Sequence, residues 1–336
     1  MRRVTIRDVA ASAGVAPSTV SAVLNQSVPT SGDVRRRVLE AVRTLGYEPD
    51  HNARNLARQR AQAIGLVIPD TENAFFAVLA GGLDAAVGDD GFSVLLHTAR
   101  YEDSREQDLV RLARSRRLDG IVYIAGTSTA TGALNELARS APVVVVDERT
   151  SGLNVPFVGA ENRRGARLAA EAALAFGHRR VGIVTGPTAL WTAEQRLAGY
   201  REGLARAGVD PDGVPSFTGD YRVESGIAAA EALLSGPRES RPTALLVSND
   251  LMAIGCLRWC FSAGISVPHD VSVVGFDDIP LARHFVPALT TVRQPAQEIG
   301  AAAGRLLLQL LRDEQPDAVS ELPTTLVTRE SLMEAP

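Results

Sequence analysis

The 336-residue sequence contains no lysine, two cysteines and five histidines, and each scarcity excludes a class of protein. Without lysine there is no glycine-rich phosphate-binding loop of the kind that ends in Lys-Ser or Lys-Thr. The histidines are scattered, and none stands in a Ser-His-Asp, HExxH or comparable catalytic arrangement. These absences argue against an enzyme, and we expect neither a catalytic residue nor a cofactor or metal.

The two cysteines, Cys256 and Cys260, lie four residues apart in a predicted helix, which places both on one face and in the core. No histidine stands nearby to complete a zinc site, and a reducing cytoplasm fits this cysteine usage. Arg2, Arg3 and Arg7 are not followed by an apolar run, so we expect no signal peptide. No stretch approaches the roughly twenty apolar residues of a membrane span. We therefore expect a cytoplasmic protein without a membrane partner.

Charge is unevenly distributed along the chain. Residues 1–60 contain ten arginines and five acidic residues, a formal charge of +5, which leaves −9 for the remainder of a chain whose total is −4. The length of 336 residues predicts two or three domains. A basic head on an acidic body suits a protein that places only its head against phosphate.

The head has the pattern of a helix-turn-helix. Residues 5–13 read as an amphipathic helix, Gly14 supplies a turn, and Pro17 suits the first position of a second helix. A third helix is predicted from about Ser31 to Leu45, with Gly46 as its C-terminal cap. The outward faces of the second helix carry small or neutral polar groups that can approach base edges. The pattern alone also allows a three-helix packing unit without a DNA role.

From residue 64 onwards, apolar runs alternate with helical segments. The runs that read as strands are 64–70, 92–99, 120–126, 142–148, 180–186, 244–250 and 271–278. Helices lie between them, such as 75–89, 105–116, 163–176, 193–207 and 251–263. This alternation predicts parallel sheets covered on both faces, and its length of about 270 residues predicts two Rossmann-like lobes.

Ligands in such folds bind beyond the carboxyl ends of the strands. The polar and aromatic residues at those ends are therefore the candidates for a small-molecule site: Asp70, Asn73, Phe75, Phe76, Asp147, Trp191, Arg196, Tyr221, Asn249, Asp250, Asp277 and Asp278. The adjacent acids Asp277 and Asp278 suggest a metal, but no further carboxylate-rich motif supports one.

Three segments carry a family resemblance: VTIRDVAASAGVAPSTVSAVLNQ, VRRRVLEAVRTLGYEPDHNARNLAR and IGLVIPD. Together they resemble the amino terminus of the lactose-repressor (LacI/GalR) family of bacterial transcription regulators, and the similarity continues through most of the chain. The resemblance implies a multidomain protein: an N-terminal all-α helix-turn-helix DNA-binding domain and an α/β body like the type I periplasmic binding proteins, with two Rossmann-like lobes.

The resemblance also implies domain boundaries. The DNA-binding domain is expected at 1–48 and a hinge helix or linker at 49–61. The N-terminal lobe of the effector domain is expected at 62–161 and 292–324, and the C-terminal lobe at 162–291 and 325–336. The chain is thus expected to cross between the lobes near positions 161, 291 and 325.

The implied function is that of a homodimeric regulator, most simply a repressor, which binds a pseudo-palindromic operator under the control of a small-molecule effector such as a sugar. Pro17 and Ser18 are the expected base-reading pair. The residues expected to hold phosphates are Thr5, Thr19, Ser21 and Asn25. Family members usually carry arginine at the position of Ala22, so the guanine contact of that arginine is missing here. The short tail after Arg329 has no leucine heptad, which favours a dimer over a tetramer.

The hinge segment carries three further DNA-binding candidates, Asn52, Ala53 and Leu56. Its composition also allows a solvated linker. In the family, this segment folds on the operator and wedges a leucine between base pairs of the minor groove, and Leu56 stands at that position. An apolar wedge opens the groove and kinks the duplex.

The resemblance implies that the small-molecule site binds an effector, and it selects a smaller set of residues for that role. Arg196, Asn249 and Asp277 stand where family members grip the effector, and a guanidinium with a carboxylate suits vicinal hydroxyls. Arg196 and Asp277 can instead simply pair with each other. The remaining members of the predicted set are Phe75, Asp147, Trp191 and Tyr221. For the three aromatic residues among them, a packing or lid role stays open. Two rival functions stay open: a cytoplasmic sugar-sensing protein without a DNA role, and a regulator that has lost effector binding.

The wedge hypothesis makes a direct prediction. Replacing Leu56 with alanine should weaken specific operator binding far more than non-specific binding, because only a kinked specific site uses the wedge. Fluorescence anisotropy on specific and scrambled duplexes measures both affinities. An equal loss on the two duplexes would remove the wedge assignment.

Overall fold

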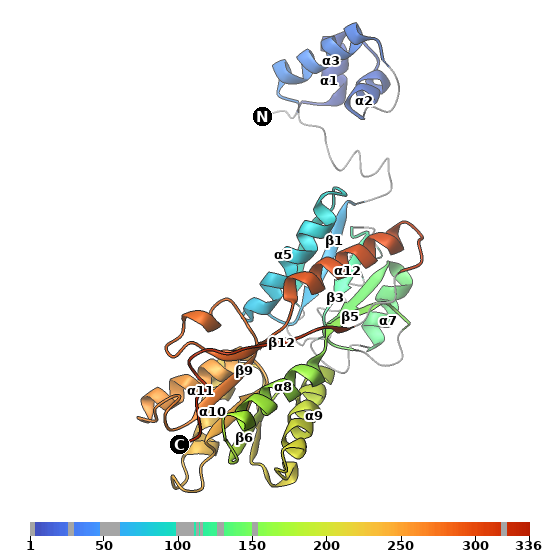
Figure 1. Cartoon of the computed structure of the whole chain (residues 1–336). Helices are drawn as coiled ribbons and strands as arrows, with labels where there is room; N and C mark the ends of the chain where they lie inside the picture. Colours follow the sequence, from blue (N-terminus) through green and yellow to red (C-terminus); the bar gives the residue numbers. More distant parts are fainter. Residues whose placement is uncertain are drawn as a thin grey trace. The chain divides into compact units, whose positions relative to one another are not determined.

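The computed structural model describes residues 4–25, 30–47, 61–98, 111, 114, 117–125, 131–149, 154–316 and 321–336. The chain divides into two units at Ala61 and Gln62 (Figure 1). The hinge candidates Asn52, Ala53 and Leu56 lie outside the described residues, as does most of the helix predicted at 105–116. Within the described ranges, no helix is both long enough and apolar enough to cross a membrane.

The first unit is a helix-turn-helix, as predicted. Its helices are α1 (Ile6–Ala13), α2 (Pro17–Asn25) and α3 (Gly32–Leu45). Thr5 and Asp8 form a capping box at the start of α1, in which the Thr5 amide donates to the Asp8 carboxylate at 2.8 Å. Gly14, with a φ of 62°, ends α1 in the left-handed region. A small core that includes the fully buried Val9, Val20 and Val38 joins the three helices.

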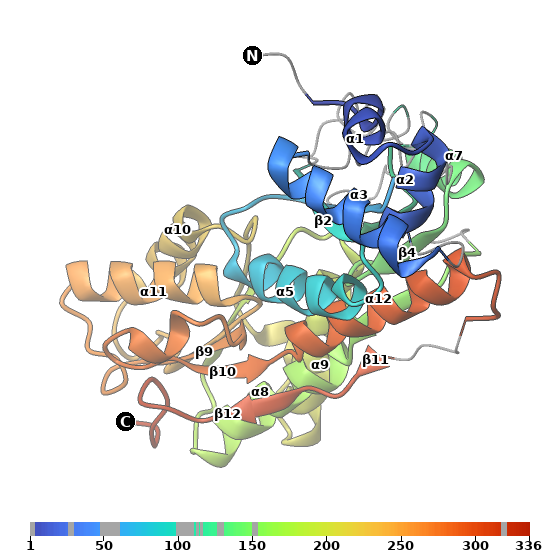
Figure 2. The same ribbon diagram turned by 90° about the horizontal axis from the view of Figure 1, so that it is seen from above.

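The second unit contains two sheets. The first is six-stranded, in the order β11-β5-β4-β3-β1-β2. Its strands are β11 (Glu321–Leu322), β5 (Phe157–Ala160), β4 (Val143–Val146), β3 (Gly120–Tyr123), β1 (Ala63–Ile68) and β2 (Ser93–Thr98), and all paired neighbours are parallel. Helices α5 (Ala74–Gly88), α7 (Thr131–Ser140) and α12 (Ala296–Leu311) belong with this sheet and complete the first lobe (Figures 1 and 2).

The second sheet has the order β12-β10-β9-β8-β6-β7. Its strands are β12 (Thr325–Val327), β10 (Thr290–Arg293), β9 (Ser272–Asp277), β8 (Ala244–Val247), β6 (Val181–Thr185) and β7 (Ser216–Thr218), and only β10 and β12 pair antiparallel. Helices α8 (Asn162–Ala175) and α9 (Trp191–Arg206) cover one face, and α10 (Val223–Leu234) and α11 (Asp250–Ser262) cover the other. This sheet and its helices form the second lobe.

The chain passes between the lobes three times: after β5, after β10, and between β11 and β12. The second passage lies later than the boundary expected at 291/292, because β10 runs to Arg293 and pairs with β9 up to Asp277. The strand ends only where Gln294 and Pro295 lead into α12. The expected boundary therefore falls inside a strand of the second lobe.

Helices α5 and α12 approach unusually closely, because glycines stand at their contact. A Cβ on Gly82 of α5 would lie 2.0 Å from the carbonyl oxygen of Gln297, and a Cβ on Gly300 of α12 would lie 2.0 Å from that of Leu79. The two backbones are thus in direct contact. This packing fixes α5, whose N-cap, Asn73, lies in the site described below.

Two neighbouring glycines of α5 provide a matched test of this packing. Gly82→Ala should lower the free energy of unfolding by about 1–3 kcal/mol, because its Cβ meets backbone that cannot move aside cheaply. Gly81→Ala, whose Cβ meets nothing within 4 Å, should raise it by about 0.5–1 kcal/mol through helix propensity. Urea unfolding followed by circular dichroism measures both. Equal effects of the two substitutions would contradict the close approach.

Candidate functional site

A cavity of about 50 Å³ lies where the carboxyl ends of strands from both sheets meet. The strand order reverses at β1 in the first sheet and at β6 in the second, the positions where open α/β sheets bind ligands. The residues that line the cavity are Pro69, Asp70, Asn73, Phe75, Phe76, Ile124, Ala125, Asp147, Glu148, Leu190, Thr192, Arg196, Tyr221, Asn249, Asp277 and Gln294.

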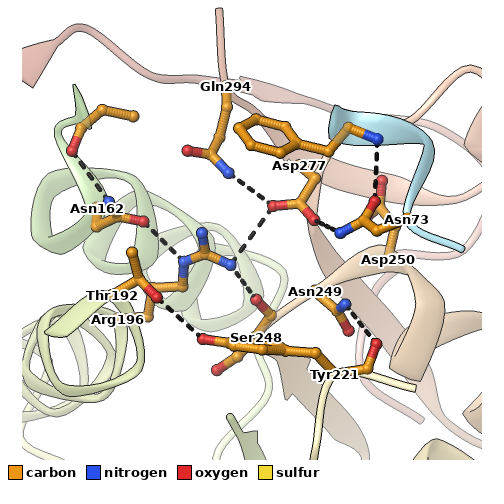
Figure 3. A network of polar contacts seen from close by, with 12 residues as sticks. Asn73, Asn162, Thr192, Arg196, Tyr221, Ser248, Asn249, Asp250, Asp277 and Gln294 are labelled. Carbon is orange, nitrogen blue, oxygen red and sulfur yellow. Dashed lines mark hydrogen bonds and ion pairs between the residues drawn. The ribbon is translucent and has the colours of Figure 1, made fainter. Parts of the chain in front are cut away.

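Arg196 of α9 lies at the centre of a buried polar network (Figure 3). Its Nε donates to Asn162 at 2.7 Å, and its Nη1 donates to the carbonyl oxygen of Ser248 at 2.5 Å and to Asp277 at 3.4 Å. The Phe276 ring centroid lies 4.0 Å from the guanidinium carbon. Because a buried guanidinium needs several acceptors at once, this network fixes its position.

Asp277 connects Arg196 to the first lobe. One carboxylate oxygen accepts a hydrogen bond from Gln294 at 2.7 Å as well as the contact from Arg196, and the other accepts from Asn73 at 3.4 Å. Asn73 in turn caps α5, since its side chain accepts from the Phe75 amide at 3.0 Å. A single carboxylate therefore joins the second lobe, the passage after β10 and the start of a helix in the first lobe.

Asn249 and Tyr221 are locked to each other. The Asn249 side chain accepts from the Met252 amide and caps α11, while its amide nitrogen donates to the carbonyl oxygen of Tyr221 at 2.9 Å. The Tyr221 ring occupies the space beside Gly186, where a Cβ would lie 2.2 Å from the ring. The absence of a side chain at Gly186 thus allows the ring to line the cavity.

Glu148 and Thr192 make a second contact between the lobes. Glu148 follows β4, and its carboxylate accepts hydrogen bonds from the amide of Thr192, at 3.2 Å, and from the Thr192 hydroxyl. Beside this contact, the rings of Phe157 and Trp191 meet edge to face with centroids 5.7 Å apart. Arg149 lies against both rings.

Three carboxylates of the cavity, Asp147, Glu148 and Asp277, are buried together with one arginine. The pKa of Asp147 is raised from 3.8 to about 7, mainly by burial and then by the neighbouring Glu148, while Arg196 opposes the shift. Burial also raises the pKa of Glu148 and that of Asp277. The site therefore contains three buried carboxyl groups and one arginine, so that ionisation of all three is disfavoured.

The remaining acids near the site have structural partners. Asp250 accepts from the Thr291 hydroxyl at 2.6 Å and from the Ile279 amide at 2.8 Å. Asp278 pairs with Arg293 at 2.7 Å and with Arg329 at 2.5 Å. The adjacent acids Asp277 and Asp278 suggested a metal site. Within the described ranges, no group of three His, Cys, Asp or Glu residues is arranged to hold an ion.

The structure brings together six of the seven predicted effector residues: Phe75, Asp147, Arg196, Tyr221, Asn249 and Asp277 all line the cavity. Trp191 does not line it and packs on Phe157 instead. The sequence reasoning missed four polar residues that line or support the cavity: Glu148, Asn162, Thr192 and Gln294. Glu148 directly follows Asp147 at the end of the apolar run 142–148, and this position at the end of a strand could have identified it as a candidate.

The predicted DNA-binding residues lie in the first unit. Pro17 and Ser18 are exposed at the start of α2, and Thr19 and Ser21 of the same helix are half-buried. Thr5 is exposed, but its hydroxyl is engaged with Asp8 at 2.7 Å, so it has a capping role. Asn25 ends α2, and its side chain lies outside the described part of the chain.

The raised pKa of Asp147 gives a stability prediction with a definite sign. A folded carboxyl that keeps its proton up to a pH of about 7 stabilises the fold at low pH, and this contribution is lost as the pH rises from about 4 to 7. Asp147→Asn should therefore flatten the fall in unfolding free energy between pH 5 and pH 8. Asparagine tolerates the φ of 64° at this position.

The measurement is urea unfolding of the full chain at several pH values. Asp313→Asn is the matched control, because Asp313 is exposed and also has a positive φ, of 56°. If the unfolding free energy of Asp147→Asn falls with pH as steeply as that of the wild-type protein, Asp147 is not the group with the raised pKa.

Family comparisons agree with the division into two units. The model of bacterial regulatory proteins of the lacI family matches residues 5–50, and that of the periplasmic binding protein-like domain matches residues 170–332. The chain is 32% identical to the catabolite control protein A of Priestia megaterium, over 98% of this chain and 99% of that protein.

Solved structures resemble the whole chain. A lac repressor dimer bound to operator and the anti-inducer ONPF matches with a TM-score of 0.88 and 28% identity, over 99% of this chain and all of that one. A complex of the transcriptional regulator CelR with cellobiose matches with a TM-score of 0.73 and 31% identity, over 98% of this chain and all of that one. This chain therefore belongs to the lacI family of bacterial transcription regulators.

Proposed function

We propose that the chain is a cytoplasmic, homodimeric repressor that binds a pseudo-palindromic operator and responds to a sugar-type effector in the cavity between the lobes. It has no enzymatic activity and needs no cofactor in this proposal. The observation that carries the proposal is the position of Asp277. It lines the cavity, pairs with Arg196 and contacts Asn73 of the other lobe.

The DNA-facing part of the proposal rests on α2. Its first residues, Pro17 and Ser18, are exposed, and the Ser18 hydroxyl is small enough to approach base edges. Arg37 of α3 donates to the carbonyl oxygen of Gly14 at 3.2 Å and so supports the turn that sets the angle of α2. In a dimer, two such helices enter successive major grooves about one helical turn apart.

The effector-facing part rests on the chemistry of the cavity. Arg196 and Asp277 offer a guanidinium and a carboxylate side by side, a pair that suits neighbouring hydroxyls. The aromatic rings of Phe75, Phe76 and Tyr221 line the same space. Cellobiose, which is bound in the CelR complex, has both features: hydroxyls and apolar ring faces.

Competition between the effector and a contact between the two lobes supplies the coupling. The cavity is bordered by Asn73 of the first lobe and Asp277 of the second, which contact each other at 3.4 Å. A sugar whose hydroxyls bind Asp277 competes with this contact. That contact involves the N-cap of α5, so the effector changes the position of α5 and its partner α12. A coupling free energy of about 1–3 kcal/mol suffices for a useful switch.

The proposal predicts selective DNA binding. Purified protein should bind the DNA directly upstream of its own gene more tightly than a scrambled duplex of equal length, and the affinity for both should fall with salt. Ser18→Ala should weaken specific binding about three- to tenfold through the loss of one hydrogen bond, with little effect on the scrambled duplex. Fluorescence anisotropy measures both affinities.

Ser12→Ala is the matched control, because Ser12 is exposed on α1 rather than on α2. It should leave both affinities unchanged. No preference between the two duplexes at any salt concentration, with or without sugars, would overturn the proposed function.

A further inference from the structure

The cavity has an excess of hydrogen-bond acceptors. Its ionisable lining residues are four acids, Asp70, Asp147, Glu148 and Asp277, the single cation Arg196, and Tyr221. Arg196 is paired with Asp277, and Glu148 accepts two hydrogen bonds from Thr192. Oδ1 of Asp147, in contrast, has no hydrogen-bond partner in the described part of the chain, and Arg196, the one cation of the lining, is already paired with Asp277.

Two acceptor atoms in the lining are buried without a partner in the described part of the chain: Oδ1 of Asp147 and Oε1 of Gln294. The two residues are 8% and 4% exposed, so water compensates neither atom fully. Buried polar atoms are nearly always paired, and an orphaned acceptor in a ligand cavity is therefore a place for a ligand donor.

Each of the three side-chain amides in the lining already donates one hydrogen bond within the protein. The Asn73 amide group donates to Asp277, that of Asn249 to the Tyr221 carbonyl oxygen, and that of Gln294 to Asp277. Arg196 directs Nε and Nη1 at protein acceptors, which leaves its Nη2 outside these contacts. The two unpartnered acceptors, Oδ1 of Asp147 and Oε1 of Gln294, therefore favour a ligand that brings hydrogen-bond donors.

The electrostatics of Asp147 agree with this geometry. The charged groups that face it are Glu148 beside it, Arg196 from α9 and Asp277 from β9, and burial with the two acids raises the pKa of Asp147 to about 7. The backbone of Asp147 has a φ of 64°, which costs energy for a residue with a side chain. Such strained residues are concentrated at functional sites, which agrees with a ligand-binding role for Asp147. A cation beside Asp147 would favour the ionised carboxylate.

We propose that the ligand of this cavity is an amino sugar, a hydroxylated ring that carries a protonated primary amine, and that Asp147 binds the ammonium group. An ammonium group offers three donors and a full charge, which match the unpaired Asp147 oxygen and the acid excess. Gln294 accepts a further hydrogen bond, and Nη2 of Arg196 donates to a ring hydroxyl. This assignment rests on the proposed effector role of the cavity and gives the effector its chemical class.

Matched pairs of sugars test the assignment. Isothermal titration calorimetry of the full chain at pH 7 compares D-glucosamine with D-glucose, D-galactosamine with D-galactose, and D-mannosamine with D-mannose. At least one amino sugar should bind about tenfold or more tightly than its neutral parent, the effect of one charge-assisted contact. Asp147→Asn should abolish that preference, and the control Asp313→Asn should retain it.

Proton release gives a second readout that a purely structural Asp147 would not move. Below the pKa of Asp147, at about 7, binding of an ammonium group ionises the carboxyl, so a proton leaves the complex. The affinity of the amino sugar should rise between pH 6 and pH 7. Its binding enthalpy should depend on the ionisation heat of the buffer in wild-type protein and not in Asp147→Asn.

Three outcomes would overturn the assignment: a neutral parent that binds as tightly as its amine, a preference that survives Asp147→Asn, or no binding by any amino sugar. If a neutral sugar changes operator affinity as strongly as its amine does, the proposed function stands and only the assignment of an amino sugar is lost. Absence of any DNA preference would remove the proposed function, while the calorimetric preference for an amine would still stand.

Discussion

The buried pair of Arg196 and Asp277 is the interaction on which the site depends. Two charges inside a protein are stable only if both are paired and their remaining hydrogen-bonding groups are satisfied. Asn162, the Ser248 carbonyl oxygen and Gln294 satisfy them here, together with Asn73 from the first lobe. Each of these groups lies on a different element. Any ligand that competes for either charge therefore acts on both lobes at once.

The backbone around this pair is held in conformations that ordinary residues avoid. Asp147, Tyr221 and Asp277 have φ values of 64°, 69° and 112°. Each residue lies at the carboxyl end of a strand or in the loop beyond it, and each lines the cavity. Such strain persists only where the surrounding structure over-determines it, and it is concentrated at functional sites. It turns the side chains of the strand ends toward the space between the lobes.

The sequence predicted the helix-turn-helix, the α/β lobes and most of the cavity, because apolar strands are easy to recognise and parallel strands end at one edge. In a regular strand, the side chains of Asp147 and Glu148 would point to opposite faces, and only one of them would reach the cavity. The positive φ of Asp147 breaks this alternation, so both line the cavity, and Glu148 was missed. The prediction named Trp191, but its neighbour Thr192 lines the cavity. Consecutive side chains on a helix point about 100° apart, and the start of α9 alone does not show which of them faces the cavity. Strands as short as β11, with two residues, leave no periodic pattern to detect.

The central claim is that the cavity and the DNA-binding unit are energetically linked, and linkage is reciprocal. The most direct measurement is a calorimetric titration of the tightest-binding sugar or amino sugar into the protein alone and into its complex with operator DNA. The account predicts that the two dissociation constants differ by about fivefold or more, by the same factor as the sugar changes operator affinity. Identical dissociation constants with and without operator would contradict it.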